Sequence, residues 1–235
     1  MKNNNNYNYL TFIPARSGSI GIKNKNIQKI GKKNLIEISI NFIKKSKLKK
    51  NLIYLSTDSK KYQKLSKKLN VNCNYLRSKK ISKSNSKIED AVIEFMTQIK
   101  KIKKNIKFKY IIILLPTQPF RSLKTFKSSI KLIGKRYKSI ISVKNLNRSK
   151  EYIFTTRKNK LKIPSYVKST NRQYIESNYT PCGCFYIVEA KSFMKKKSFY
   201  IPKIKHIITK FPQNLDIDTK FDLSLANMIF KSGKN

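Results

Sequence analysis

Short apolar runs alternate with amphipathic stripes from Tyr9 to Val143, and no other feature of the sequence constrains the fold as strongly. The runs have the length and composition of buried strands, and they lie at Tyr9–Ile13, Leu52–Leu55, Tyr110–Leu115 and Ser139–Val143. Between these runs, apolar residues recur at helical spacing in residues 34–47, 62–69, 88–99 and 123–133. Strands that alternate with helices predict an α/β fold built on a mostly parallel sheet.

The alternation breaks after Lys144. Residues 151–166 have the pattern of two short strands around a polar turn at Arg157–Lys160, and no stripe of helical length returns before Thr219–Lys231. Strand patterns resume at Cys184–Val188 and His206–Phe211. We therefore expect residues 145–181 to form an inserted β-rich arm within a domain of residues 9–235, and the polar residues 1–8 to be a disordered leader.

The strong positive charge raises the question of nucleic-acid binding. The chain has 54 Lys and Arg against 11 Asp and Glu, a net charge of +43, but only seven of the cations are Arg. Proteins that contact bases and phosphates favour Arg for its bidentate fork, and here lysines are spread evenly over the whole chain. We expect a solvated basic surface that attracts anionic ligands and no specific nucleic-acid partner. A basic protein that binds nucleic acid or another anion remains the alternative.

The rest of the composition bears on where the protein is located and on which catalytic or metal sites it can form. No apolar stretch is long enough to span a membrane and none has the form of a signal peptide, so we expect a cytoplasmic protein without membrane contact. A single histidine leaves little room for a Ser-His-Asp or Cys-His catalytic site. The chain contains four residues that could form a zinc site: Cys73, Cys182, Cys184 and His206. Their spacing fits no known zinc-binding pattern, so we favour buried free thiols as the interpretation.

Polar segments follow three of the predicted strands directly. The first, Pro14–Gly21, combines small residues with Arg16, and Lys25 lies just beyond it; Ser56–Ser59 and Pro116–Arg121 follow the other two. In an open α/β sheet, ligands bind outside the carboxyl ends of the strands. Backbone N–H groups beside two fixed cations suit a polyphosphate, although an ordinary turn would also fit the first segment taken alone.

A second constellation is Asp216 and Asp218, separated by one residue just before the last predicted helix. In an extended segment the period of two places both carboxylates on one face. Two neighbouring carboxylates repel each other unless they share a cation, so Mg²⁺ is the natural third member. The alternative is that Asp218 and Thr219 cap the helix. The scarcity of acidic residues in this chain favours the metal.

Five segments in order resemble the acylneuraminate (CMP-sialic acid) cytidylyltransferase family. They are FIPARSGSIGIKNKNI, YLSTDS, LLPTQPFR, PCGCFYI and LDIDTKFDL, and together they span the chain from about Tyr9 to Ile229. The resemblance implies a Rossmann-like nucleotidyltransferase domain, a dimerisation arm at the insertion, and therefore a homodimer. It also implies CTP and a nine-carbon 2-keto sugar acid (nonulosonic acid) as substrates, with Mg²⁺ as cofactor.

The resemblance also assigns roles to individual residues. Those expected to bind the nucleotide are Arg16, Ser17, Gly18, Lys25 and Asn26, and those expected to bind the sugar acid are Gln118, Arg121 and Arg172. Asp216 and Asp218 would hold the metal, and Arg16, Lys25 and Asp218 would act in catalysis.

Three departures from the family pattern bear on the substrate. Ile20 stands where the family usually has Lys, Leu115 where it has Gln, and Cys182 where it has Asn. The first removes a cation from the phosphate loop. The other two leave the acceptor open among sialic, legionaminic, pseudaminic and 3-deoxy-octulosonic acids, and PTQPFR fits the octulosonic branch least well.

Overall fold

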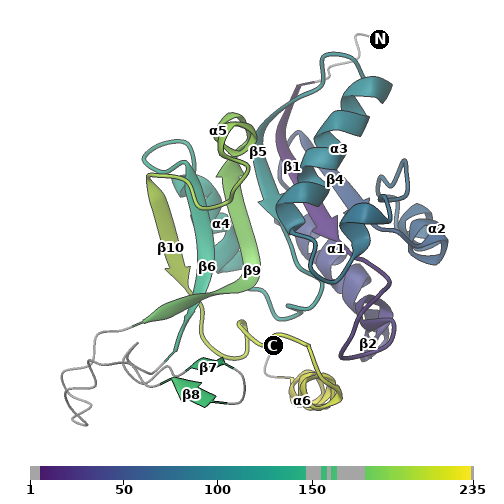
Figure 1. Cartoon of the computed structure of the whole chain (residues 1–235), viewed down its shortest axis with the longest axis vertical. Coiled ribbons are helices and arrows are strands. Elements are labelled where there is room, and N and C mark those ends of the chain that lie inside the picture. The colour runs from purple at the N-terminus through teal and green to yellow at the C-terminus, as the bar shows by residue number, and fades with distance from the viewer. Residues whose placement is uncertain (1–5, 147–154, 158–159, 163–177, 234–235) are drawn as a thin grey trace.

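The computed structural model describes residues 6–146, 155–157, 160–162 and 178–233. Within them, a central sheet of six strands has the order β10-β6-β9-β5-β1-β4 (Figure 1). Its members are β1 (Asn6–Pro14), β4 (Asn51–Ser56), β5 (Lys107–Ile113), β6 (Ser139–Asn145), β9 (Tyr179–Glu189) and β10 (Ile204–Ile208). All neighbouring pairs are parallel except the two that β9 makes with β5 and β6. The predicted α/β fold with a mostly parallel sheet is confirmed.

Helices cover both faces of the sheet. They are α1 (Leu35–Ser46), α2 (Lys60–Lys68), α3 (Ile88–Ile102), α4 (Leu123–Leu132), α5 (Ala190–Lys196) and α6 (Lys220–Lys231). Successive side chains of β1 point to opposite faces: Phe12 packs in one core cluster with Phe95 of α3, and Ile13 in another with Ile40 of α1. The two clusters make a three-layer α/β/α sandwich, as the apolar composition of the strands requires.

Short elements complete the connections. They are η1 (Lys25–Ile27), β2 (Lys29–Ile30), β3 (Lys33–Asn34) and η2 (Lys80–Ser82). Asn34 caps α1 by accepting a hydrogen bond from the Glu37 backbone N–H, and Ser59 and Ser122 cap α2 and α4 in the same way. None of the described helices is both long and apolar enough to cross a bilayer.

Several predicted boundaries change. The expected leader of residues 1–8 is too long, because β1 begins at Asn6 and the Tyr7 ring stacks on Phe108 with the centroids 5.6 Å apart; residues 1–5 lie outside the described residues. The sequence pattern does not predict helix α5, because its seven residues are too few to show a periodic stripe.

The inserted arm is described only in part. β7 (Thr155–Arg157) and β8 (Lys160–Lys162) pair antiparallel, as predicted for the segment around the polar turn. The other residues of the predicted arm between 147 and 177 lie outside the described residues.

Candidate active site

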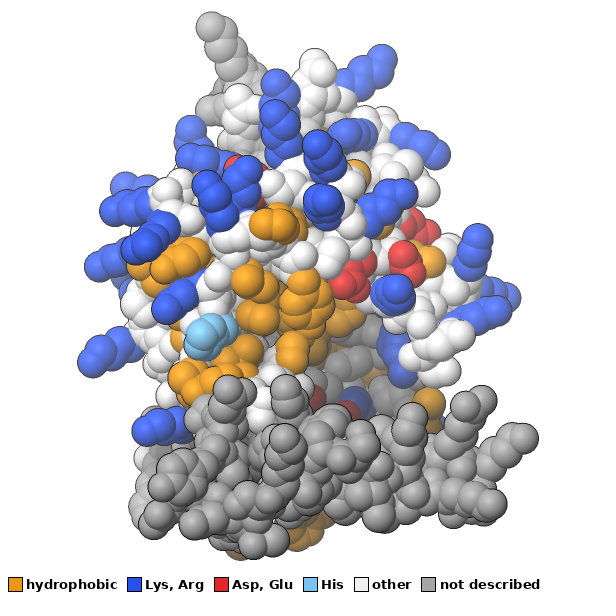
Figure 2. All heavy atoms as spheres, turned by 60° about the vertical axis from the view of Figure 1, so that its left-hand side comes forward, with side chains coloured by type: hydrophobic (Ala, Val, Ile, Leu, Met, Phe, Trp, Pro, Cys, Tyr) orange, Lys and Arg blue, Asp and Glu red, His pale blue; other side chains and the backbone are white. Residues whose placement is uncertain are grey.

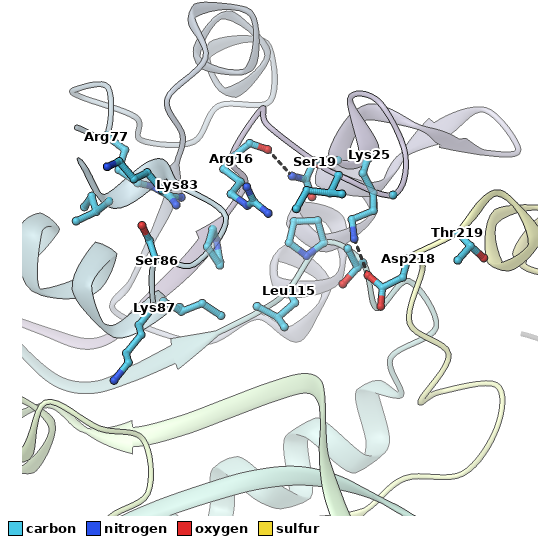
Figure 3. Close-up of a pocket in the computed structure, with 18 residues that line it drawn as sticks. Arg16, Ser19, Lys25, Arg77, Lys83, Ser86, Lys87, Leu115, Asp218 and Thr219 are labelled. Carbon is cyan, nitrogen blue, oxygen red and sulfur yellow. Dashed lines mark hydrogen bonds and ion pairs between the residues drawn. The ribbon is translucent and has the colours of Figure 1, made fainter. Parts of the chain in front are cut away.

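The three polar segments predicted to follow strands meet at one edge of the sheet. β4, β1 and β5 are adjacent and parallel, so their carboxyl ends lie side by side (Figure 1). A cavity of about 500 Å³ opens there. It is lined by residues from the loop after β1, the segment around η2, the segment after β5 and the approach to α6 (Figure 3).

The cavity has an excess of positive charge. Among the described residues that line it, five are cationic and one is acidic: Arg16, Lys25, Arg77, Lys83 and Lys87 against Asp218. A concave surface that gathers cations in this ratio attracts a polyanion of the size of a nucleoside triphosphate. Figure 3 shows that these cationic side chains come from different segments of the chain.

Arg16 is held by the loop that carries it. Its guanidinium donates to the Gly18 carbonyl, and its own carbonyl accepts a 2.9 Å hydrogen bond from Nδ2 of the buried Asn26. Asn26 lines the cavity, as predicted, and its amide also fixes the backbone of Arg16. These two hydrogen bonds constrain the conformation of the loop, which an ordinary turn would not need.

Ser17 and Gly18 do not line the cavity, and their expected contact with the nucleotide stays a prediction. Ser17 is turned toward the segment after β4: its backbone N–H donates to Asp58 Oδ1 at 2.7 Å, and its hydroxyl donates to Oδ2 at 3.0 Å. Asp58 thus ties two of the three polar segments together.

Lys25 meets Asp218 across the mouth of the cavity. Lys25 Nζ lies 2.7 Å from Asp218 Oδ1 (Figure 3). The two segments also touch through their backbones, because a Cβ added at Gly21 would lie only 2.3 Å from the Asp218 carbonyl oxygen. Residues that are distant in sequence, one expected at the phosphates and one at the metal, are in direct contact.

Asp216 lies deeper than Asp218. Its Oδ1 atom is buried and has no hydrogen-bond partner, whereas the Asp218 side chain is largely exposed. Burial, reinforced by the charge of Asp218, raises the pKa of Asp216, and Thr117, Lys25 and Gln118 offset part of that rise. An unpartnered buried carboxylate oxygen needs a cation or a proton.

The capping alternative is confirmed for Thr219 and wrong for Asp218. Thr219 is the N-cap of α6, and it forms a capping box with Asp222: the Thr219 hydroxyl accepts from the Asp222 backbone N–H, and the Asp222 carboxylate accepts from the Thr219 backbone N–H. The carboxylate of Asp218 is left to face Lys25.

The two carboxylates fit a hard divalent cation. No group of three or more His, Cys, Asp and Glu side chains in the described residues is arranged to hold a metal. Mg²⁺, however, is commonly bound by one or two carboxylates together with substrate phosphates and water. Asp216 itself does not line the cavity, but Thr117, Lys25 and Asp218, which do line it, lie close enough to shift the pKa of Asp216.

Arg77 is a site residue that the sequence did not reveal. It is buried at the cavity wall, where Nε donates to Ser56 Oγ at 3.1 Å and a terminal nitrogen donates to the Ser56 carbonyl at 2.6 Å. Burial lowers its pKa, and the nearby Asp58 carboxylate opposes that shift. The one signal available was its rarity, since the chain has only seven Arg.

Two residues expected to bind the sugar acid do not line the cavity. Arg121 is buried: Nε donates to the Cys184 carbonyl at 2.6 Å, and its terminal nitrogens donate to Ser39 Oγ and the Leu115 carbonyl. Burial lowers its pKa to about 10. Gln118 is also fully buried. Gln118 and Arg121 are buried, whereas Pro116 and Thr117 of the same PTQPFR segment line the cavity, so the cavity lining does not support the predicted contact of Gln118 and Arg121 with the sugar acid. Arg172 lies outside the described residues.

The departures from the family pattern lie at different depths. Ile20 and Leu115 both line the cavity, and the Ile20 side chain is 84% exposed at its mouth. Cys182 is buried. The three cysteines are free, but only Cys182 and Cys184 are buried as expected, since Cys73 is half-buried; the Cys182 and Cys184 sulfurs are 3.5 Å apart. His206, the fourth residue of the alternative zinc site, stacks on the ring of Tyr179.

Comparison with known proteins agrees with this geometry. The model of a family described as Cytidylyltransferase matches residues 10–231. The CMP-N,N'-diacetyllegionaminic acid synthase of Legionella pneumophila (strain Philadelphia 1) is 25% identical over 239 residues, covering 94% of this chain and 96% of that protein.

Solved structures share the fold. A CMP:2-keto-3-deoxy-manno-octonic acid synthetase complexed with CTP superposes with a TM-score of 0.67 at 10% identity, covering 96% of this chain and 99% of the other. The 4-diphosphocytidyl-2C-methyl-D-erythritol synthase of Anaerococcus prevotii gives a TM-score of 0.61 at 15% identity, covering 97% and 100%. At such identities these structures establish the common fold and nothing beyond it.

Proposed function

Because this chain belongs to the cytidylyltransferase family, we propose that it transfers CMP from CTP to a nine-carbon 2-keto sugar acid and releases pyrophosphate. The observation that carries the proposal is the meeting of Arg16, Lys25 and Asp218 at one cation-rich cavity at the carboxyl ends of β1 and β5. The acceptor class rests on the similarity to the diacetyllegionaminic acid synthase, whose product is a CMP-linked sugar acid of this kind.

In the proposed reaction, the anomeric hydroxyl of the acceptor attacks the α-phosphorus of CTP in line, and pyrophosphate leaves. Arg16 lies on a loop anchored by Asn26 and would bind the phosphates with a bidentate fork. Lys25 would exchange its partner Asp218 for a phosphate oxygen. Both cations act by positioning the phosphates and neutralising charge in the transition state.

Asp216 and Asp218 would hold Mg²⁺. The bound ion would neutralise negative charge on the phosphates that it contacts. The support is the unpartnered Asp216 oxygen, together with the rise in the Asp216 pKa that Asp218 reinforces. A divalent cation would relieve both the burial cost and the repulsion.

We also propose that the protein forms a homodimer through the exposed face of β10. Ile204 and Ile208 are exposed on this strand at the edge of the described sheet, and Tyr179 and Phe211 add further exposed apolar surface. Figure 2 shows hydrophobic side chains gathered around the single histidine, which lies on β10. Apolar patches and unpaired edge strands of this kind mark interfaces. The change Ile208→Lys should shift the mass in solution toward the monomer, and Ile102→Lys on α3 is the matched control.

A cytoplasmic location follows from the same proposal, because CTP is a cytoplasmic nucleotide and three free cysteines suit a reducing compartment.

The direct test is pyrophosphate release with CTP and Mg²⁺ across a panel of sialic, legionaminic, pseudaminic and 3-deoxy-octulosonic acids. We expect release that depends on a nine-carbon acid and that falls sharply when ATP, GTP or UTP replaces CTP. Asp218→Asn is the matched inactive control. Release without any acceptor, or equal turnover with all four nucleotides, would contradict the proposal.

A further inference from the structure

Two buried thiols lie in contact on β9. Cys182 and Cys184 flank Gly183 on β9, both are buried, and their sulfurs are 3.5 Å apart. Residues two apart on a strand share a face. Here Gly183 has a φ of +79°, and the register between β6 and β9 shifts just beside it. A glycine is needed for that backbone, and the irregularity keeps the two thiols together.

The surroundings make the two thiols unequal. Cys182 Sγ is 3.2 Å from Thr209 Oγ1, and Cys184 Sγ donates to the Gln213 carbonyl at 3.0 Å. Once Cys182 has ionised, Cys184 can donate a hydrogen bond to its thiolate, which lowers the pKa of Cys182, while the same pairing together with burial raises the pKa of Cys184. One thiol therefore ionises before the other. Such an arrangement gives a nucleophile and a resolving partner.

We propose that Cys182 and Cys184 form a reversible redox pair, oxidised by a peroxide to an intramolecular disulfide that lowers the activity of the neighbouring site. The Cys182 thiolate attacks one peroxide oxygen: an S–O bond forms and the O–O bond breaks. The released hydroxide takes up the proton that Cys182 lost on ionisation and leaves as water. The Cys184 sulfur then attacks the Cys182 sulfenic acid: the S–S bond forms, the S–O bond breaks, and the second hydroxide takes the Cys184 proton and leaves as water. The two thiols lose two electrons to the peroxide, and a dithiol reductant restores them.

The burial of the two sulfurs limits which oxidants can reach them. Both sulfurs are buried, and burial slows the oxidation of a thiol. A small molecule such as hydrogen peroxide reaches such a site more readily than glutathione disulfide does. The reduced state is the resting one in a reducing compartment, where disulfides are transient and regulatory.

The pair is connected to the cavity through packing and hydrogen bonds. A Cβ at Gly183 would lie 2.7 Å from Leu115 Cδ1, so the glycine is in close contact with a residue that lines the cavity. The Cys184 carbonyl accepts from Arg121, which also donates to the Leu115 carbonyl. A disulfide brings its sulfurs to about 2.05 Å, well inside their present separation, and β9 must shift to allow it. That shift would move Leu115.

The experiment uses the full chain, reduced and then treated with hydrogen peroxide. Thiols are alkylated and the peptides are analysed by mass. We expect two of the three thiols to be lost as a Cys182–Cys184 disulfide and to return after treatment with dithiothreitol. Cys73→Ser is the matched control and should form the same disulfide, since Cys73 donates to the Tyr75 carbonyl away from the pair. Cys184→Ser should form none. A stable sulfenic or sulfinic acid on Cys182 of the wild-type chain, or no reaction while Cys73 oxidises, would overturn the proposal.

The effect on activity rests on the proposed function and is measured separately. Oxidised enzyme should release pyrophosphate about 10²-fold more slowly, the scale expected for a displacement of roughly 1 Å at an active site. Reduction should restore the rate, and oxidised Cys184→Ser should keep the rate of its own reduced form. Full activity in the oxidised, disulfide-bonded protein would refute the regulatory role. Inactivity of the reduced protein as well would instead refute the proposed function and leave the disulfide assignment intact. Melting curves of each variant verify that it is folded.

Discussion

Replacing Asp216 by Asn should stabilise the protein while disabling it. Asp216 Oδ1 is buried without a hydrogen-bond partner, and burial raises the pKa of the carboxyl. A buried unpaired acceptor costs about 1–3 kcal/mol, and a charged one costs more than an amide. If Asn recovers on the order of 1 kcal/mol, the melting temperature should rise by about 2–4 °C for a domain of this size.

The difference in stability between the wild type and Asp216→Asn should depend on pH in one direction. Because the pKa of Asp216 is raised in the folded protein above its ordinary value of 3.8, the folded state binds the proton more tightly than the unfolded state does. Ionisation of Asp216 therefore lowers stability as the pH rises through the raised pKa. The advantage of Asp216→Asn should be full at pH 7 and vanish below the ordinary value, where both states are protonated.

The assay is thermal unfolding followed by circular dichroism at neutral and acid pH, with Asp218→Asn as control. Asp218 is largely exposed, and among the described residues its carboxylate pairs with Lys25 alone, so its replacement should change the free energy of unfolding by less than about 1 kcal/mol. Adding Mg²⁺ and CTP should raise the melting temperature of the wild type but not of Asp216→Asn. A lower melting temperature for Asp216→Asn at pH 7, independent of pH, would refute the reasoning.

Three further substitutions test the architecture of the site. Arg16→Ala should lower kcat by roughly 10²–10³, with Arg16→Lys recovering only part, and near-normal rates in the Ala variant would show that the loop is only a turn. Gly21→Ala places a Cβ within 2.3 Å of the Asp218 carbonyl oxygen, so we expect about a 10²-fold loss of kcat/KM with little change in far-ultraviolet circular dichroism. Arg121→Lys breaks hydrogen bonds to the buried Cys184 carbonyl and the partly buried Leu115 carbonyl, and it should destabilise the protein by on the order of 3 kcal/mol in denaturant unfolding; unchanged stability would support a ligand role for Arg121.

Most of the sheet and of the long helices could be predicted from the sequence because their signals are local. The apolar run at Tyr110–Leu115 predicts a buried strand wherever it lies, and the stripe of α1 predicts a helix from neighbouring residues alone. Polar segments that follow strands likewise predict where ligands bind. The same local evidence identified Arg16, Lys25 and Asp218, which do line the cavity.

Burial and long-range pairing were decided only by the tertiary structure. Nothing near Arg121 in sequence reveals that its fork is satisfied by the Cys184 carbonyl, 63 residues away, and not by a ligand. Lys25 and Asp218 pair across 193 residues. The antiparallel insertion of β9 into the sheet brings Cys184 to Arg121. Periodicity records which face of an element is apolar, whereas the partner of a buried polar group depends on how distant elements pack, and that information is absent from any short stretch of the chain.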